Sequence, residues 1–249
     1  EIMHMIWGAL AKAAPQRSLA GWGKNSFPNA SGRDAEGRTW IMYNWGGNSG
    51  AGAAMNRDGF NQMGPMITLG GLTIPNAETY EQLYPVLVRR HEMRCDGGGP
   101  GKFRGGTGVT YEVDVLSNAD YSFRAEGLAR PTGIGVLGAE SGAIGRITLT
   151  EADGKPRLGP PYAIWRLSPA NLLIESPGGG GVGNPLERDV DHVVRDVRDG
   201  AVSPAAAHDI YGVVIRADGK SADRTATEWR RKELASRGAI RAKPEALPA

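Results

Sequence analysis

The sequence predicts an α+β fold with a β-rich middle of mixed or antiparallel sheet and helices at the N- and C-terminal ends. Short apolar segments recur at intervals of roughly 10–20 residues through the middle of the chain, with glycine-containing turns between them. Near both ends, apolar side chains instead lie at helical spacing. Glycine makes up 37 of the 249 residues without the Gly-X-Y period of collagen, which indicates many tight turns and close contacts between backbone segments.

The predicted helices begin and end at residues that favour helix boundaries. Ile2, Ile6 and Leu10 lie on one helical face, and Pro15 ends that pattern. Asp189 and Ser203 are suitable N-caps, because their side chains can accept the first free backbone N–H groups. Helices are expected at residues 1–14, 77–84, 190–199 and 204–211, and a basic helix is expected from a Thr225–Glu228 capping box to about residue 236.

The predicted strands alternate apolar and polar side chains, as half-buried strands do. They are expected at residues 39–45, 86–93, 108–116, 121–125, 145–150, 162–167, 171–175 and 212–216. A turn is expected around residues 31–34, and residues 53–76 form a long loop with closely spaced glycines and prolines. A loop of this length in a compact domain indicates a functional segment or an interface.

Charge and cysteine content exclude several classes of partner. The chain carries 29 Lys and Arg against 27 Asp and Glu, a net charge of +2, so neither nucleic acid nor an anionic membrane is an expected partner. No apolar run approaches the roughly 20 residues that a membrane span needs. The single cysteine, Cys95, cannot form an internal disulfide, which is typical of a cytoplasmic protein.

The sequence predicts no metal ligands in this chain. Its four histidines, His4, His91, His192 and His208, stand far apart, and none belongs to a closely spaced pair. With one cysteine, no structural zinc site can be assembled.

No cofactor-binding residue is predicted either. Gly178, Gly180 and Gly183 match the spacing of a dinucleotide-binding loop, but Pro185 separates them from the next helix, so a structural turn is favoured. Residues 219–221 resemble the end of a phosphate-binding loop, yet Val214 stands where its first glycine belongs.

Two carboxylates are the candidate catalytic groups. Glu78 and Glu81 are three residues apart, so they share one face of the helix predicted at 77–84. Such a pair, partly buried beside the long glycine-rich loop, is suited to general acid/base chemistry. Two solvated carboxylates on either side of Tyr80 are the alternative.

Two longer strings resemble a known family. Residues 94–108, RCDGGGPGKFRGGTG, are similar to the R-x-D-S-G-G-x-G-x-x-R-G-G-x-G stretch of the hydantoinase B/oxoprolinase family, and residues 178–189, GGGGVGNPLERD, to its G-G-G-G-Y-G-D-P-x-E-R-D signature. Residues 196–203, 211–214 and 75–85 also fit, in the family's order. The sequence departs from the pattern at Gly98, where Ser is usual, and at Val182, where an aromatic residue is usual.

The resemblance covers about residues 1–216 and the C-terminal portion of a longer family polypeptide. It implies a B-type subunit of an ATP-dependent cyclic-amide hydrolase that works with an ATP-binding A-type subunit. ATP with Mg²⁺ would then bind the A-type partner, and a divalent metal would bind the N-terminal portion of the B-type subunit, outside this chain. An α-type subunit of an acetone or acetophenone carboxylase is the alternative enzyme, and a non-catalytic assembly module of such a complex is the third possibility.

Arg104, Gly105 and Gly106 are the candidate substrate-binding residues. The neighbouring glycines let the Arg104 guanidinium reach past the backbone to a carboxylate or phosphate of a small-molecule substrate. In the alternative, the glycines permit segments to cross and Arg104 pairs with a carboxylate such as Asp96. We expect residues 1–216 to form the family portion and residues 217–249 a basic helical tail, which is either solvated or a subunit contact.

Overall fold

The β-rich middle of the chain forms two antiparallel sheets. The computed structural model describes residues 2–26, 28–43, 46–64 and 76–241, the last five of these by their backbone alone. One sheet has the strand order β2-β1-β5-β8 and the other β3-β4-β9-β6-β7. The first comprises β1 (Asn29–Arg33), β2 (Thr39–Met42), β5 (Ala119–Arg124) and β8 (Tyr162–Leu167). The second comprises β3 (Val86–Met93), β4 (Val109–Val115), β6 (Arg146–Thr150), β7 (Pro156–Leu158) and β9 (Ala170–Glu175).

The two sheets share one apolar core. Strands β4, β5 and β9 each alternate buried and more exposed residues, as a sheet with one covered face requires. The buried side chains of both sheets belong to a single cluster, which includes Met42, Tyr121, Val113 and Leu172. Burial of these side chains is the main stabilisation of this half of the molecule.

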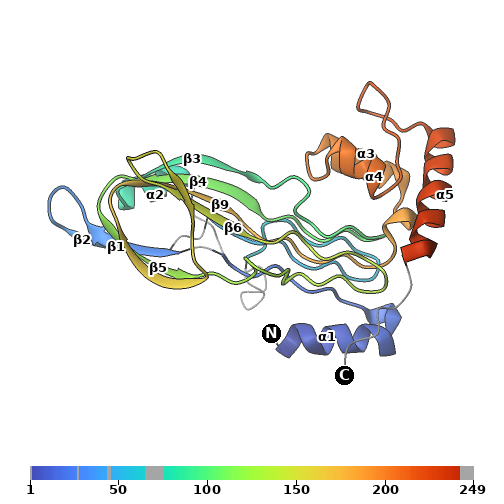
Figure 1. Ribbon diagram of the computed structural model, residues 1–249, viewed down its shortest axis with the longest axis horizontal. Coiled ribbons are helices and arrows are strands. Elements are labelled where there is room, and N and C mark those ends of the chain that lie inside the picture. Colours follow the sequence, from blue (N-terminus) through green and yellow to red (C-terminus); the bar gives the residue numbers. More distant parts are fainter. Residues whose placement is uncertain (1, 27, 44–45, 65–75, 242–249) are drawn as a thin grey trace.

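Glycine-rich extended segments lie between the sheets and the C-terminal helices (Figure 1). They belong to neither a helix nor a strand, and their backbone N–H groups donate to carbonyls of neighbouring segments. At their centre, Gly178–Gly181 donate in turn to the carbonyls of Ala143, Gly106, Gly21 and Glu140. The glycine excess of the sequence is therefore used for packing backbone directly against backbone.

These central glycines follow a three-residue period. A Cβ on Gly178 or on Gly181 would overlap the backbone of residues 97–100. A Cβ on Gly179 would overlap Ala51, and one on Gly180 would overlap Ile134. Successive residues thus face three different neighbours, as in a left-handed extended helix with three residues per turn, where only glycine fits a crowded contact.

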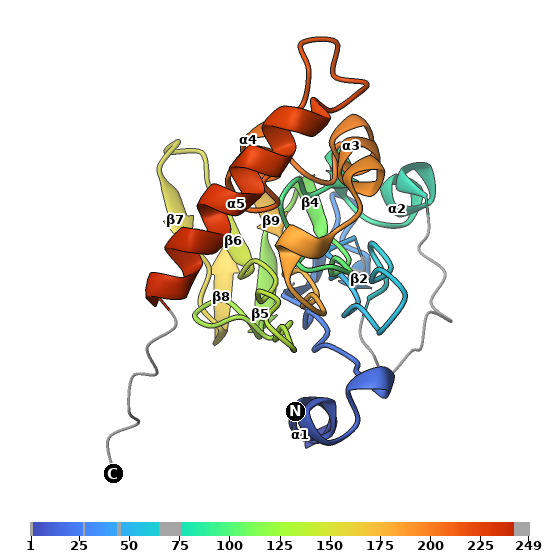
Figure 2. The same cartoon turned by 90° about the vertical axis from the view of Figure 1, so that its right-hand side faces the viewer.

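The helices lie at both ends of the chain and once before β3. They are α1 (Ile2–Ala13), α2 (Ala77–Leu83), α3 (Val190–Arg198), α4 (Pro204–Asp209) and α5 (Arg224–Arg241), with single 3-10 turns at Pro15–Arg17 and Pro185–Glu187. No described helix is both long and apolar enough to cross a membrane. Figure 2 shows α5 running across the end of the molecule that α3 and α4 also occupy.

The C-terminal helices have a small core of their own. Val193 of α3, Ala207 of α4 and Ala222 before α5 belong to one buried cluster. Arg231 of α5 donates to the backbone carbonyls of Arg188 and Tyr211, at 2.6 and 3.1 Å. Helix α5 is thereby attached to the preceding segments, and the division of the chain at 216/217 stays a prediction.

Three sequence expectations about elements are wrong. The turn expected at 31–34 lies later, at 34–38, because residues 31–33 belong to β1 and pair with β2. The strand expected at 212–216 makes only the Ile215–Ala222 bridge. Helix α5 begins at Arg224, where the Asp223 carboxylate accepts the N–H of Ala226, so Thr225 is not its cap. The short strand β7 had no counterpart among the expected strands.

Candidate functional site

The two family-like strings cross in the glycine-rich layer. Phe103 and Val182 form an antiparallel bridge in which each backbone N–H donates to the other's carbonyl at 2.9 Å. A Cβ on Gly105 would overlap the Gly179 carbonyl, and a Cβ on Gly106 would overlap the Phe60 carbonyl. The N–H groups of these two glycines donate to Gly99 and Ala51. Gly105 and Gly106 thus bring three remote segments into backbone contact.

Arg188 joins these strings to the loop that precedes them. Its side chain is 1% exposed and binds Asp58 in a bidentate pair, with Nη1–Oδ1 2.7 Å and Nη2–Oδ2 2.6 Å. Its Nε and Nη2 also donate to Asp196 Oδ2 of α3, at 3.0 and 2.8 Å. Nη1 further donates to the Lys102 carbonyl at 3.1 Å. One guanidinium therefore connects loop 46–64, the string at 94–108 and α3.

Arg104 lies in the same charge cluster. Its side chain is buried, with Nε 3.4 Å from Asp196 Oδ2 and Nη1 donating to the Gly105 carbonyl at 2.6 Å. Its backbone N–H donates to Asp58 Oδ1 at 2.8 Å. The carboxylate beside Arg104 is therefore Asp196, not the Asp96 considered from the sequence, whose carboxylate accepts the N–H of Ser203.

The cluster favours the ionised form of Asp58. Burial opposes the charge of Asp58, but the hydrogen bonds and charge of Arg188 outweigh burial and lower the pKa of the carboxyl. Arg188 itself is held protonated: burial disfavours its charge, but Asp58 and Asp196 more than compensate and raise its pKa. Burial also raises the pKa of the neighbouring Tyr211 hydroxyl, so that residue stays neutral. Two arginines and two aspartates thus balance in charge and fix the crossing segments in place.

The candidate catalytic pair lies elsewhere. Glu78 is exposed in the first turn of α2, and Glu81 Oε1 accepts the N–H of Val88 at 2.8 Å. Figure 1 shows α2 beside the sheets and α3 at the opposite end of the long axis. Because Arg104 pairs with Asp196 of α3, the structure does not bring it together with the two glutamates.

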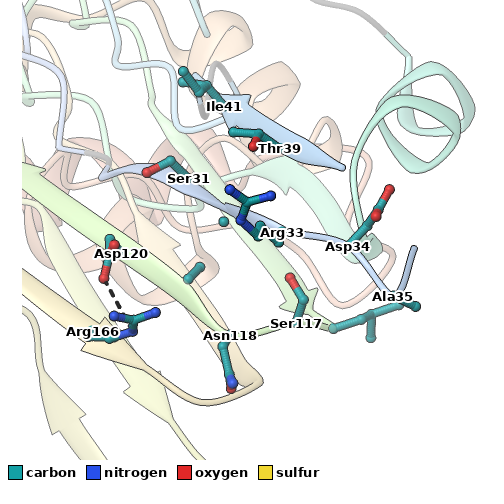
Figure 3. Close-up of a pocket in the computed structure, with 13 residues that line it drawn as sticks. Ser31, Arg33, Asp34, Ala35, Thr39, Ile41, Ser117, Asn118, Asp120 and Arg166 are labelled. Carbon is teal, nitrogen blue, oxygen red and sulfur yellow. Dashed lines mark ion pairs between the residues drawn. The ribbon is translucent and has the colours of Figure 1, made fainter. Parts of the chain in front are cut away.

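An open pocket of about 650 Å³ lies on the outer face of the first sheet (Figure 3). It lies between the turn after β1 and the turn before β5, and the pair Asp120–Arg166, at 3.8 Å, forms one side. Arg33, Asp34 and Ser117 lie on the other side (Figure 3). None of the five residues proposed from the sequence lines this pocket.

The described carboxylates and histidines form no metal cluster, and the glycines at 178–181 are used for backbone packing. The described residues contain no group of three or more His, Cys, Asp and Glu side chains that could hold a metal. The glycines at 178–181 donate their N–H groups to protein carbonyls, so these donors cannot cradle a phosphate. Gly178 and Gly180 therefore belong to an extended packing segment, whereas the sequence favoured a structural turn.

Sequence reasoning missed Asp58, Arg188 and Asp196 as a unit. Asp58 and Arg188 are 130 residues apart, and neither lies in a spacing pattern that points to the other. Arg188 was present only as one letter of the second family-like string. The second family-like string identifies Arg188 as part of a motif. It gives no information about the residues that Arg188 binds.

The sequence of this chain is similar to those of two characterised or proposed amide-hydrolase subunits. The chain is 36% identical to the caprolactamase beta subunit of Pseudomonas jessenii over 223 residues, which is 85% of this chain and 38% of that protein. It is 31% identical over 218 residues to a putative D-/L-hydantoinase B subunit of Pseudomonas sp. (strain NS671), covering 86% of this chain and 36% of that protein. The chain therefore spans less than half the length of these relatives.

Two solved structures share the fold. The ATP-dependent caprolactamase of Pseudomonas jessenii superposes with a TM-score of 0.77 at 35% identity, over 90% of this chain and 40% of that chain. A nucleotide-free acetone carboxylase superposes with a TM-score of 0.81 at 19% identity, over 96% of this chain and 37% of that chain. The family model described as hydantoinase B/oxoprolinase matches residues 1–185. The chain belongs to the hydantoinase B/oxoprolinase family.

Proposed function

We propose that this chain is the C-terminal part of the B-type subunit of an ATP-dependent cyclic-amide hydrolase. The observation that carries the proposal is the 36% identity to the caprolactamase beta subunit across 85% of the chain. In this proposal the chain acts with an ATP-binding A-type subunit and with the N-terminal portion of its own B-type subunit. The complex works in the cytoplasm, which accords with a single cysteine that has no partner in the chain.

The carboxylase alternative has less support. The acetone carboxylase has the higher TM-score, but its 19% identity supports a common fold and not a common reaction. The 35% identity of the caprolactamase structure favours hydrolysis of a cyclic amide. Carboxylation of a ketone is therefore an outcome that the assay must be able to detect.

ATP with Mg²⁺ and a divalent metal belong to other parts of the proposed complex. Asp196, which is buried, and Asp58, whose side chain is 34% exposed, both already bind Arg188, so they are not free to ligate a metal. The chain's own contribution is a rigid scaffold that fixes the crossing segments, together with any residues that it presents to the substrate.

For those residues we retain Glu78 and Glu81 as acid/base groups and Arg104, Gly105 and Gly106 as substrate-binding residues. Glu78 is exposed on α2, so in this proposal the partial burial that acid/base chemistry needs comes from a partner or the bound substrate.

Arg104→Lys keeps a cation beside Asp196 and loses the planar guanidinium. If Arg104 binds a substrate carboxylate, the KM of the assembled complex rises while its thermal stability is retained. A lowered Tm with an unchanged KM in the remaining folded enzyme would assign Arg104 to the scaffold alone.

The proposed function is tested with the complete B-type subunit and its A-type partner. Release of the ring-opened amino acid and of ADP would be measured with caprolactam, 5-oxoproline and hydantoins, with and without ATP. Acetone and acetophenone with bicarbonate test the alternative reaction. We expect ATP-dependent opening of at least one cyclic amide and no ketone carboxylation; carboxylation without amide hydrolysis would refute the proposal.

A further inference from the structure

A positively charged hollow lies between α3 and the loop that precedes α5. It has a volume of about 460 Å³ and is lined by Asp191, Val194, Arg195, Arg198 and Lys220. Val194, Arg195 and Arg198 share one face of α3 with Asp191, because they follow it at helical spacing. Lys220 comes from the loop, which lies beside α3 in both views (Figures 1 and 2). Three of the five lining side chains are therefore basic, and they come from two segments.

The carboxylate in this lining is already neutralised. Asp191 Oδ1 lies 2.6 Å from Nη2 of Arg224, the first residue of α5. Arg198 lies 3.0 Å from its neighbour Asp199, but both side chains are exposed, so this pair is weak. The hollow consequently keeps an excess of positive charge.

Arg195 and Lys220 carry most of that excess. Neither forms an ion pair with another residue in the part of the chain that the structure describes. The macrodipole of α3 stabilises cations near its C-terminal end, which accounts for Arg195 and Arg198. It does not account for Lys220, which approaches the same face from another segment and adds to the charge repulsion. An anion bound between the two segments would relieve that repulsion.

The loop fixes the position of Lys220. Asp218 Oδ1 accepts the backbone N–H groups of Lys220 and Ser221, at 2.8 and 3.2 Å. The N–H of Gly219 donates to the Arg216 carbonyl, and the N–H of Arg216 donates to the Ser221 carbonyl, each at 2.9 Å. These backbone donors are used inside the turn, so its resemblance to the end of a phosphate-binding loop does not provide a backbone cradle. An anion in the hollow would be bound by side chains.

We propose that this hollow binds the phosphate groups of a small polyanion through Arg195, Arg198 and Lys220. A guanidinium binds phosphate oxygens with two parallel N–H donors, and an ammonium group adds a compact point charge. Inorganic phosphate, pyrophosphate and the phosphate chain of a nucleotide share this chemistry. The inference goes beyond the proposed function, and it does not depend on which reaction the complex catalyses.

The shape and charge of the site favour a compact anion over a large one. Its volume falls in the range of about 300–1,000 Å³ that is typical of small-molecule sites. The basic side chains surround one hollow from two segments, whereas an extended acidic chain needs a row of cations. The chain's net charge of +2 gives no broad positive field for nucleic acid.

Isothermal titration calorimetry of the full 249-residue chain tests the site without any turnover. The probes are inorganic phosphate, pyrophosphate and ATP without Mg²⁺, each titrated at fixed ionic strength against a sodium chloride blank. Arg195→Gln and Lys220→Gln each remove one charge from the hollow, and both side chains are exposed, so the fold should be retained. Lys220→Arg keeps the charge. Arg166→Gln, which removes an 81% exposed cation from β8, is the matched control for the loss of net charge.

We expect saturable binding of pyrophosphate, with a Kd that Arg195→Gln and Lys220→Gln each raise by at least about fivefold, because each removes a charge-assisted hydrogen bond. Lys220→Arg and Arg166→Gln should keep most of the affinity. Two sources of phosphate are distinguished by the same titrations. Tighter binding of ATP than of pyrophosphate would support the proposal with a nucleotide as ligand, and equal or weaker binding of ATP would support it with an inorganic phosphate compound.

Three results would overturn the assignment. They are the absence of saturable binding for every probe, an unchanged affinity in both Gln variants, and an equal loss of affinity in Arg166→Gln. Tighter binding of a hexaglutamate peptide than of pyrophosphate would also overturn it, because the hollow would then be a contact for an acidic protein segment.

Discussion

Arg188 shows how one residue organises segments that the sequence keeps far apart. Its guanidinium donates to two aspartates and a backbone carbonyl, and its own carbonyl accepts from Arg231 of α5. Such a group is costly to bury alone and stable only when its donors are satisfied. The network therefore makes the loop, both family-like strings and the C-terminal helices interdependent.

We expect Arg188→Met to lower the free energy of unfolding by about 3–5 kcal/mol, because it leaves Asp58 and Asp196 without their buried partner. Urea denaturation followed by circular dichroism measures this change. Arg166→Met removes an 81% exposed partner of Asp120 and should stay within about 0.5 kcal/mol of the parent. Equal effects of the two substitutions would contradict the role given to Arg188.

The Asp58 carboxyl gives this network a pH dependence. Its pKa is lowered in the folded state, so its stabilisation is complete above the ordinary pKa of about 4 and is lost as the pH falls through the folded value. Asp58→Asn should reduce stability at pH 7 and weaken the loss of stability between neutral pH and pH 2. Denaturation midpoints across that range test this. A variant that retains the parent's full acid sensitivity would show that other carboxyls dominate.

Glycine substitutions separate close packing from backbone freedom. Gly106→Ala places a Cβ on the Phe60 carbonyl. Neither backbone segment can move away without disturbing its other neighbours in the glycine-rich layer. We expect a loss of several kcal/mol, of the order seen for overpacked cores. Gly8→Ala, in α1 with open space around it, should instead stabilise the helix by roughly 0.5–1 kcal/mol. Thermal denaturation measures the stability of both variants. A Gly106→Ala variant as stable as the parent would contradict the packing described for the glycine-rich layer.

At the scale of elements, local signals predicted most boundaries. Strands 86–93 and 162–167 agree with β3 and β8 residue for residue, and Asp189 and Ser203 cap α3 and α4 as expected. The errors arose where distant residues decide the outcome. Gly32 belongs to a strand because it pairs with Trp40 of β2 and Ala119 of β5, and Val214 leaves the expected strand because its N–H donates to Thr227 Oγ1.

Helix α2 carries the proposed catalytic carboxylates, and its role can be separated from its stability. Glu81→Gln keeps an oxygen that can accept the Val88 N–H, and Glu78 is exposed, so both Gln variants should fold and assemble normally. If the pair acts in acid/base chemistry, turnover of the assembled complex should fall by about 10²–10⁴-fold. Glu36→Gln, an exposed carboxylate in the turn between β1 and β2, is the control. Unchanged turnover in both variants would remove α2 from the mechanism.

At the scale of the whole molecule, the family-like strings predicted more of the site than spacing alone. They marked Arg104, Gly105, Gly106 and Arg188 as parts of two motifs, and the structure shows that those motifs cross and share one charge cluster. The partner identities were not predictable, because Asp58 and Asp196 meet Arg188 only through long-range packing. The sequence predicted that the glycines form turns and close contacts. It did not predict that Gly178–Gly181 face three different neighbouring segments in turn, because that arrangement depends on the segments packed around them.

We propose that this chain works as part of a cyclic-amide hydrolase. The most direct test is turnover of caprolactam and 5-oxoproline by the complete B-type subunit with its A-type partner, with release of the ring-opened amino acid and of ADP measured together. We predict ring opening that requires ATP and both subunits. Carboxylation of a ketone without ring opening, or ring opening that is independent of ATP, would refute the proposed function.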